Sequence, residues 1–466
     1  MMDLFHIAEV LIQEASYPYA EVRVQIDDQE LIWLRNGELE SYGTESVGGI
    51  SARVLVDGGL GFASTSSEKK AKYILELAAK NSRAASRRGN VSLSEERFER
   101  AEFRVPTVKN PWDVPPEEKI EILRSLDSIA KEEGIVARSI MMSISKEVIY
   151  FLNSEGASVR GEVPRISISL ILTHVSGQRS TQEYESRGGS GGFEIVDGWK
   201  LDDFMKEISK SMKERLEKGV PAPKGKMDVV IGPSISGLVA HESTGHPYEA
   251  DRVLGREAAQ AGESFVTKDM LGTRIGSELV SVADDPTIEG SYGFYLYDFE
   301  GVKARRRILM KNGIINEFLH NRETASIFGV KSNGAARASA FNREPIVRMS
   351  NTFIMPGDRS VEELIEDVSE GVYMRRFMEW NIDDRRYNQR YVGSEAYMIR
   401  GGRIAEIVLK PILEVTTPSF YSSVDGVGKD LEFQAATCGK GDPGQGVPVW
   451  TGGPTIRLRG VGLGGI

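Results

Sequence analysis

Two of the chain's five histidines lie close together, with a glutamate directly after the first. They occur in the stretch VAHESTGHPYEAD, residues 239–251, as His241, Glu242 and His246. Imidazole nitrogens bind transition metals, and a neighbouring carboxylate can act as a general base in metal-assisted hydrolysis. Histidine is so rare in this sequence that an H-E-x3-H match is rarely accidental, and the pattern predicts a metal site.

The five-residue spacing does not suit a regular α-helix. Side chains five residues apart point about 140° away from each other, because each residue turns the helix by about 100°. Two local changes could bring His246 back towards His241. The helix could end near Thr244 with Gly245 as a left-handed cap, or a single π-turn could be inserted.

A catalytic zinc usually has three protein ligands and one open position, so a third ligand is needed. The other histidines, His6, His174 and His320, occur in patterns typical of core or surface positions. Cys438 is the alternative, in the glycine-dense stretch TCGKGDPGQGVP, which predicts a loop. Glu242 would accept a proton from the attacking water and return it to the leaving amine.

Each candidate also has a plainer interpretation. Paired histidines are often ordinary core or surface residues, and a lone cysteine is often a buried apolar side chain. Arg337 and Arg348 are candidates for binding a substrate carboxylate or carbonyl group, and ordinary ion pairs are the alternative for both.

Composition bounds the class of protein. The 466 residues are 40% hydrophobic and 27% charged, which predicts a soluble, globular chain of two or more domains. The net charge of −10 argues against a nucleic-acid binder. A single cysteine excludes an intrachain disulfide and favours the reducing cytoplasm. No apolar run is long enough to predict a membrane span, and the first residues do not resemble a signal peptide.

Periodicity predicts an α+β fold with two domains. Strand patterns with turns at Asn36 and Asp57, and helices over 115–134 and 197–219, predict a mixed α/β domain over residues 1–222. The proline- and lysine-containing stretch VPAPKGK marks the boundary. Residues 223–466, rich in short strands and glycine turns, predict a β-rich domain that carries the metal site.

The site itself is expected on a strand–turn–helix unit. Residues 227–232 predict a buried strand, and residues 233–246 predict a helix with Ser234 as its N-cap. The aromatic run over 292–301 predicts a strand in the core.

Together these segments resemble the TldD/PmbA family of metalloproteases. The resemblance covers nearly the whole chain and is carried by HESTGH, GSYGFYLYDFEG, RMSNTFIMPGD, SEAYMIRGGRI and CGKGDPGQGVPVWTGGPTIRLRG. It implies that His241, His246 and Cys438 bind one zinc ion per active subunit and that Glu242 is the base. It also implies a two-domain fold.

The family pairs a metal-bearing TldD-type subunit with a metal-free PmbA (TldE)-type subunit, and this chain resembles the TldD type. The resemblance implies cleavage of small or unfolded peptides in an enclosed chamber, with a paralogue or a second copy as partner. The alternatives are a non-catalytic peptide-binding or scaffold subunit and an amide hydrolase with non-peptide substrates. The chain departs from bacterial members of the family at Pro247, Tyr248 and residues 374–393. The substrate selectivity of those members therefore does not carry over to this chain.

Overall fold

The computed structural model describes residues 2–86, 90–257 and 263–465 of the chain. Helices and strands are mixed within these ranges, and most neighbouring strands are antiparallel, so the predicted α+β class is confirmed. The division at residue 222 into two domains stays a prediction.

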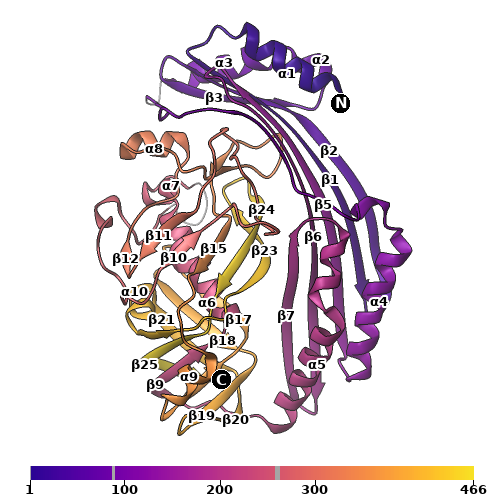
Figure 1. Ribbon diagram of the computed structural model, residues 1–466, viewed down its shortest axis with the longest axis vertical. Coiled ribbons are helices and arrows are strands. Elements are labelled where there is room, and N and C mark those ends of the chain that lie inside the picture. The colour runs from indigo at the N-terminus through magenta and orange to yellow at the C-terminus, as the bar shows by residue number, and fades with distance from the viewer. Residues whose placement is uncertain (1, 87–89, 258–262, 466) are drawn as a thin grey trace.

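The first half of the chain forms one long, curved sheet (Figure 1). The strand order is β3-β2-β1-β5-β6-β4, and β7 also pairs with β6. The strands are β1 Tyr19–Arg35, β2 Glu38–Val56, β3 Gly59–Thr65, β4 Arg100–Arg104, β5 Ala137–Asn153, β6 Ser158–Ser176 and β7 Arg179–Ser190. Asn36 and Asp57 adopt left-handed φ angles of 52° and 51° in the predicted hairpin turns.

Helices cover this sheet on its outer side and at one end (Figure 1). They are α1 Met2–Glu14, α2 Glu68–Ala71, α3 Ile74–Ala85, α4 Pro116–Glu132 and α5 Leu201–Lys218. Apolar residues of α4 and α5 form one buried cluster with the sheet, and those of α1 and α3 form another. The long strands are therefore anchored at both ends.

The second half builds further sheets around a separate apolar core. One sheet has the order β12-β11-β10-β15-β24-β23, another has β17-β18-β21-β25-β9-β16-β19-β20-β8 with β22 beside β25, and β13 pairs with β14. The strands are β8 Val220–Pro221, β9 Gly225–Ile231, β10 Val282–Asp284, β11 Arg307–Lys311, β12 Ile314–Ile315, β13 Ala336–Arg337, β14 Ile346–Val347, β15 Asn351–Ile354, β16 Glu370–Met374, β17 Phe377–Ile382, β18 Asn388–Gly393, β19 Ala396–Arg400, β20 Arg403–Leu409, β21 Pro411–Thr416, β22 Val424–Val427, β23 Glu432–Lys440, β24 Gln445–Gly453 and β25 Ile456–Gly465. The helices are α6 Pro233–Ala240, α7 Ala250–Val253, α8 Arg322–Phe328, α9 Val361–Glu366 and α10 Thr417–Ser422.

The aromatic run over 292–301 is not a strand, so that prediction is wrong. The segment is a series of turns, although Phe294 and Tyr297 are buried as expected. The carboxylate of Asp298 accepts backbone N–H bonds from two residues that follow it, and Gly301 has a φ of +74°. These local bonds give the backbone an alternative to strand pairing.

The second half lies on the inner side of the curved sheet (Figure 1). Ser186 on β7 donates from its hydroxyl to the carbonyl of Ala435 on β23 at 2.5 Å. The indole N–H of Trp450 on β24 donates to the carbonyl of Gly188 at 2.8 Å. The edge strand β23 is thereby held next to β7, and this position matters for the site.

Candidate metal centre

The two histidines lie on a π-turn. Helix α6 runs directly into a π-helical turn over His241–Gly245. The backbone N–H of His246 donates to the carbonyl of His241, five residues back. A bond of this length widens the turn and brings side chains five residues apart onto one face. The structure therefore contains the second of the two alternatives that the spacing left open.

The residues at both ends of this helical segment explain its shape. Gly232 is the N-cap and Pro233 begins the helix, so the predicted N-cap role of Ser234 is wrong. Proline suits the first helical position because its φ is fixed and it needs no N–H partner. Gly245 has a φ of −54° and is no left-handed cap. Its role is steric, since a Cβ there would lie 1.9 Å from Sδ of Met349.

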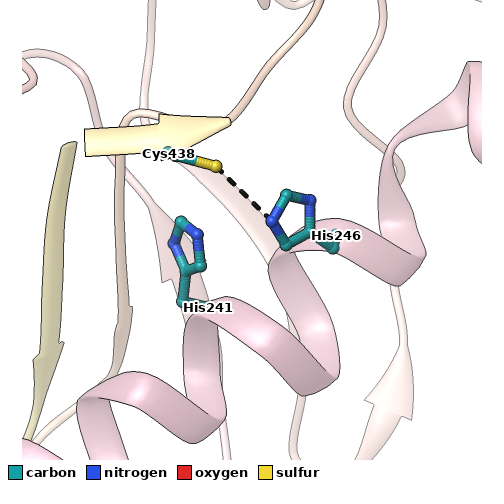
Figure 2. A group of neighbouring side chains, drawn as sticks. All are labelled: His241, His246 and Cys438. Carbon is teal, nitrogen blue, oxygen red and sulfur yellow. Dashed lines mark hydrogen bonds between the residues drawn. The ribbon is translucent and has the colours of Figure 1, made fainter. Parts of the chain in front are cut away.

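Cys438 approaches the two histidines from strand β23 (Figure 2). Its Sγ lies 3.4 Å from Nε2 of His246. One ligand atom from each of His241, His246 and Cys438 lies within 4.8 Å of the other two. The expected loop position is wrong, because Cys438 pairs with Val447 in the sheet and the left-handed Gly441 begins the turn only afterwards.

These three side chains fit a small metal ion. They are 5%, 3% and 5% exposed for His241, His246 and Cys438, and Nδ1 of His241 has no hydrogen-bond partner among the described residues. A tetrahedral zinc ion, with bonds of about 2.0–2.3 Å, separates its ligand atoms by about 3.3–3.6 Å. Two imidazoles and one thiolate leave a fourth position for water.

Local charges favour the thiolate form of Cys438. Burial alone raises the pKa of its thiol, but His246, His241 and Arg348 oppose this, and the pKa lies well below its ordinary value. Burial lowers the pKa of His246, whereas Cys438 and Glu249 raise it, with a net value of about 9. The thiolate is the form of cysteine that binds metals.

Glu249 and Lys440 support His246 from behind. Glu249 Oε2 lies 3.0 Å from Nδ1 of His246 and 3.2 Å from Nζ of Lys440. Burial raises the pKa of Glu249, but Lys440 and His246 lower it far below its usual range. Lys440 also donates to Asp251 at 2.7 Å. No sequence signal pointed to Lys440, because a loop was expected there and only the strand places Cys438 and Lys440 on the same side.

A cavity of about 420 Å³ lies beside the three side chains. Besides them, its walls include residues of the β17–β18 hairpin and of the edge strand β23. Glu242 lines this cavity and forms an ion pair with Arg386, which follows β17. The sequence marked residues 374–393 as unusual but gave no reason to select Arg386, because the pairing joins segments 144 residues apart.

Arg337 and Arg348 do not line this cavity. Both are buried and bind backbone carbonyl groups. Arg348 donates to the carbonyls of Cys438 and, at 2.7 Å, Gln445. Arg337 donates to the carbonyl of Met349 at 2.8 Å. Arg348 therefore helps to fix the strand that carries Cys438.

The other three histidines lie elsewhere. His6 is exposed on α1. His174 is buried on β6, and its Nδ1 lies 2.9 Å from the carbonyl of Gly134. His320 is buried, with Nδ1 3.2 Å from Oγ1 of Thr324. Within the described ranges, His241, His246 and Cys438 form the group of potential ligands close enough to share one ion.

Almost the whole chain matches known protein domain families. Three domain families match in sequence order: PmbA/TldA metallopeptidase domain 1 at residues 20–85, the central domain at 109–219 and the C-terminal domain at 224–465. The chain belongs to the PmbA/TldD metallopeptidase family. The resemblance read from the sequence is thereby confirmed, and the C-terminal match contains every residue of the candidate metal centre.

Relatives of this family member are named metalloproteases. One from Methanothermobacter thermautotrophicus is 34% identical over 465 residues, covering 100% of this chain and 99% of the relative. One from Methanocaldococcus jannaschii is 34% identical, covering 94% and 95%. A protein named zinc metalloprotease TldD homolog, from Saccharolobus solfataricus, is 26% identical, covering 75% and 76%.

Solved structures share the fold. TldE from Thermococcus kodakarensis has a TM-score of 0.73 at 19% identity, with 100% of both chains covered. A structure from Thermotoga maritima has a TM-score of 0.74 at 19% identity, also with 100% of both chains covered.

No helix in the described part of the chain is long and apolar enough to cross a membrane.

Proposed function

We propose that this family member is a TldD-type, zinc-dependent peptidase, with His241, His246 and Cys438 as ligands of one zinc ion. One observation supports this proposal above all. Three buried side chains, which lie up to 197 positions apart in the sequence, place their ligand atoms within 4.8 Å of one another. A zinc ion bound there supplies Lewis-acid chemistry, which polarises a carbonyl group and acidifies water. The name of the relative from Saccharolobus solfataricus supports zinc.

Glu242 is proposed as the general base. Its side chain lines the same cavity as the three ligands and is only 8% exposed. A carboxylate in this position takes the proton from the attacking water and returns it to the leaving amine. A purely structural metal site has no need of such a group, and this favours an enzyme over a scaffold subunit.

Strand β23 is proposed to bind the substrate backbone. It is the last strand of its sheet, and residues 434–439 line the cavity. An extended peptide added to this edge would present its backbone close to Cys438. Backbone pairing gives broad sequence tolerance but demands an unfolded chain, so we propose small or unfolded peptides as substrates.

A partner subunit is proposed to enclose the cavity. A TldE-like paralogue or a second copy of this chain would suit this role, because TldE shares the whole fold. Light scattering of the protein alone and mixed with such a paralogue distinguishes the two. The proposed thiolate ligand needs a reducing environment, consistent with a cytoplasmic location.

Two substitutions and a chelator test the function. Purified protein should contain one zinc per active subunit and cleave unstructured peptides, and a chelator should abolish cleavage. Glu242→Gln should keep zinc and peptide binding but lose turnover. Unchanged turnover in Glu242→Gln would remove Glu242 from the mechanism.

Cys438→Ser should sharply weaken zinc retention, and full zinc content in that variant would exclude Cys438 as a ligand. Small non-peptide amides are the control substrates. Turnover of those alone would favour a different amide hydrolase.

A further inference from the structure

The β17–β18 hairpin reaches the proposed base through Arg386. Its Nη1 forms an ion pair with Oε2 of Glu242, and the two side chains are 7% and 8% exposed. Both line the cavity beside the candidate metal centre. The hairpin belongs to residues 374–393, the segment expected from the sequence to depart from bacterial members of the family.

The backbone of Arg386 is fixed in a conformation unusual for arginine. Its φ is +64°, in the left-handed region that favours glycine and asparagine. Its N–H donates to the carbonyl of Asp383 at 3.0 Å, and its carbonyl accepts from Oγ1 of Thr417 at 2.7 Å. These two bonds hold the arginine backbone in this locally unfavourable conformation.

A second contact joins the same hairpin to the next residue of the π-turn. Nε2 of Gln389, on β18, donates to Oγ of Ser243 at 2.5 Å and also to Oγ1 of Thr417. All three side chains are buried. Glu242 and Ser243, which are consecutive in sequence, are therefore both held by β17–β18.

We propose that Arg386 is a positioning residue that orients the carboxylate of Glu242 towards the reacting water and makes the β17–β18 hairpin part of the catalytic apparatus. This inference rests on the proposed peptidase function. A free glutamate side chain has several rotamers, and a planar guanidinium bonded to one carboxylate oxygen restricts them. A base displaced by about 1 Å can lose about 100-fold in rate.

The test uses the full-length, zinc-loaded protein and an unstructured peptide substrate. Arg386→Gly removes the guanidinium and suits the left-handed backbone. We expect kcat to fall about 100-fold, with KM and zinc content close to those of the unaltered protein, and a lower melting temperature because Glu242 loses its buried cation. Added guanidinium ion at low concentration should restore part of kcat in Arg386→Gly and none in Glu242→Gln.

Arg390→Ala is the matched control. Arg390 lies on the same hairpin and pairs with Glu379 at 3.0 Å, outside the cavity. Its loss should leave kcat within about twofold, because an exposed pair contributes little. Arg386→Lys, which keeps charge but loses the planar fork, should recover only part of the rate.

Several outcomes overturn the inference. Arg386→Gly with unaltered kcat would show that Glu242 needs no positioning. A rise in KM alone would make Arg386 a substrate-binding group. Loss of zinc, without rescue of kcat by guanidinium, would make the ion pair a structural brace. If the unaltered, zinc-loaded protein has no turnover, the proposed function itself fails, and the inference fails with it.

Discussion

Replacing Gly245 with alanine tests whether close packing holds the π-turn. A Cβ at this position would lie 1.9 Å from Sδ of Met349, and 3.2 Å and 3.3 Å from the adjoining Cγ and Cε. Favourable contacts between such atoms lie at about 3.5–4.0 Å. The turn and Met349 would therefore have to separate by about 1.5 Å.

The surroundings leave little room for that movement. Met349 is 0% exposed, and its carbonyl accepts from Arg337 at 2.8 Å. Overpacking of this kind costs about 1–3 kcal/mol. Alanine recovers about 0.5–1 kcal/mol because it restricts the unfolded chain more than glycine does. We expect a net loss of about 1–2 kcal/mol in the free energy of unfolding.

The turn carries His246 as its next residue, so zinc affinity should fall as well. A loss of about 10–100-fold is expected, the range seen when residues supporting a ligand are altered. Competition with a chromophoric chelator measures the affinity, and urea unfolding of the metal-free protein measures the stability.

Gly439→Ala is the control for this experiment. Gly439 is also next to a proposed ligand, Cys438, but a Cβ there meets no atom within 4 Å. Adding Met349→Ala to Gly245→Ala should restore zinc affinity while lowering stability by about 2–5 kcal/mol through the cavity it leaves. Unaltered stability and zinc affinity in Gly245→Ala would refute the packing argument.

Three further predictions concern buried charges. Lys440→Met should weaken zinc binding about 10–100-fold, because Glu249 loses its closest cation and holds His246 less firmly; equal affinity by chelator competition would contradict this. Burial lowers the pKa of His320 to about 4 from an ordinary 6.5, so the unfolded chain binds more protons between these values. Stability should therefore fall by about 3 kcal/mol as pH drops from about 6.5 to 4, and His320→Phe should remove that part of the pH dependence in urea unfolding. Arg53→Met should cost about 3–5 kcal/mol, because Arg53 bridges buried Glu21 and Glu300 at 2.6 and 2.7 Å, and an unchanged urea midpoint would argue against it.

The sequence correctly predicted features that depend on the conformation of a few neighbouring residues. The spacing of His241 and His246 required an irregular turn, because helix geometry alone separates them. The hairpin turn at Asn36 followed from residue types that tolerate a left-handed backbone. The N-cap of helix α6 was wrongly assigned to Ser234. Pro233 marks the first helical residue more strongly than Ser234 marks a cap, so the cap is Gly232.

The remaining features depend on contacts between distant segments. Residue types made Cys438 a candidate third ligand, but only the family resemblance assigned it to the histidines, since no local pattern connects positions almost two hundred residues apart. Its placement on a strand follows from pairing with β24, which overrides the glycines around it. The pairing of Arg386 with Glu242 has no sequence signature, because a left-handed arginine is locally unfavourable and is kept by its surroundings.

The separation of His246 and Cys438 by 192 residues gives a bound ion a second consequence. In the proposed site, zinc held by both would act as a reversible crosslink between a helix terminus and a sheet edge. Closing a loop of that length in the unfolded chain costs about 5 kcal/mol of entropy, and the folded chain has met this cost before the ion arrives. Metal release and unfolding would therefore be linked in both directions. Separation of β23 from the π-turn lets the ion leave, and loss of the ion removes the crosslink that opposes that separation.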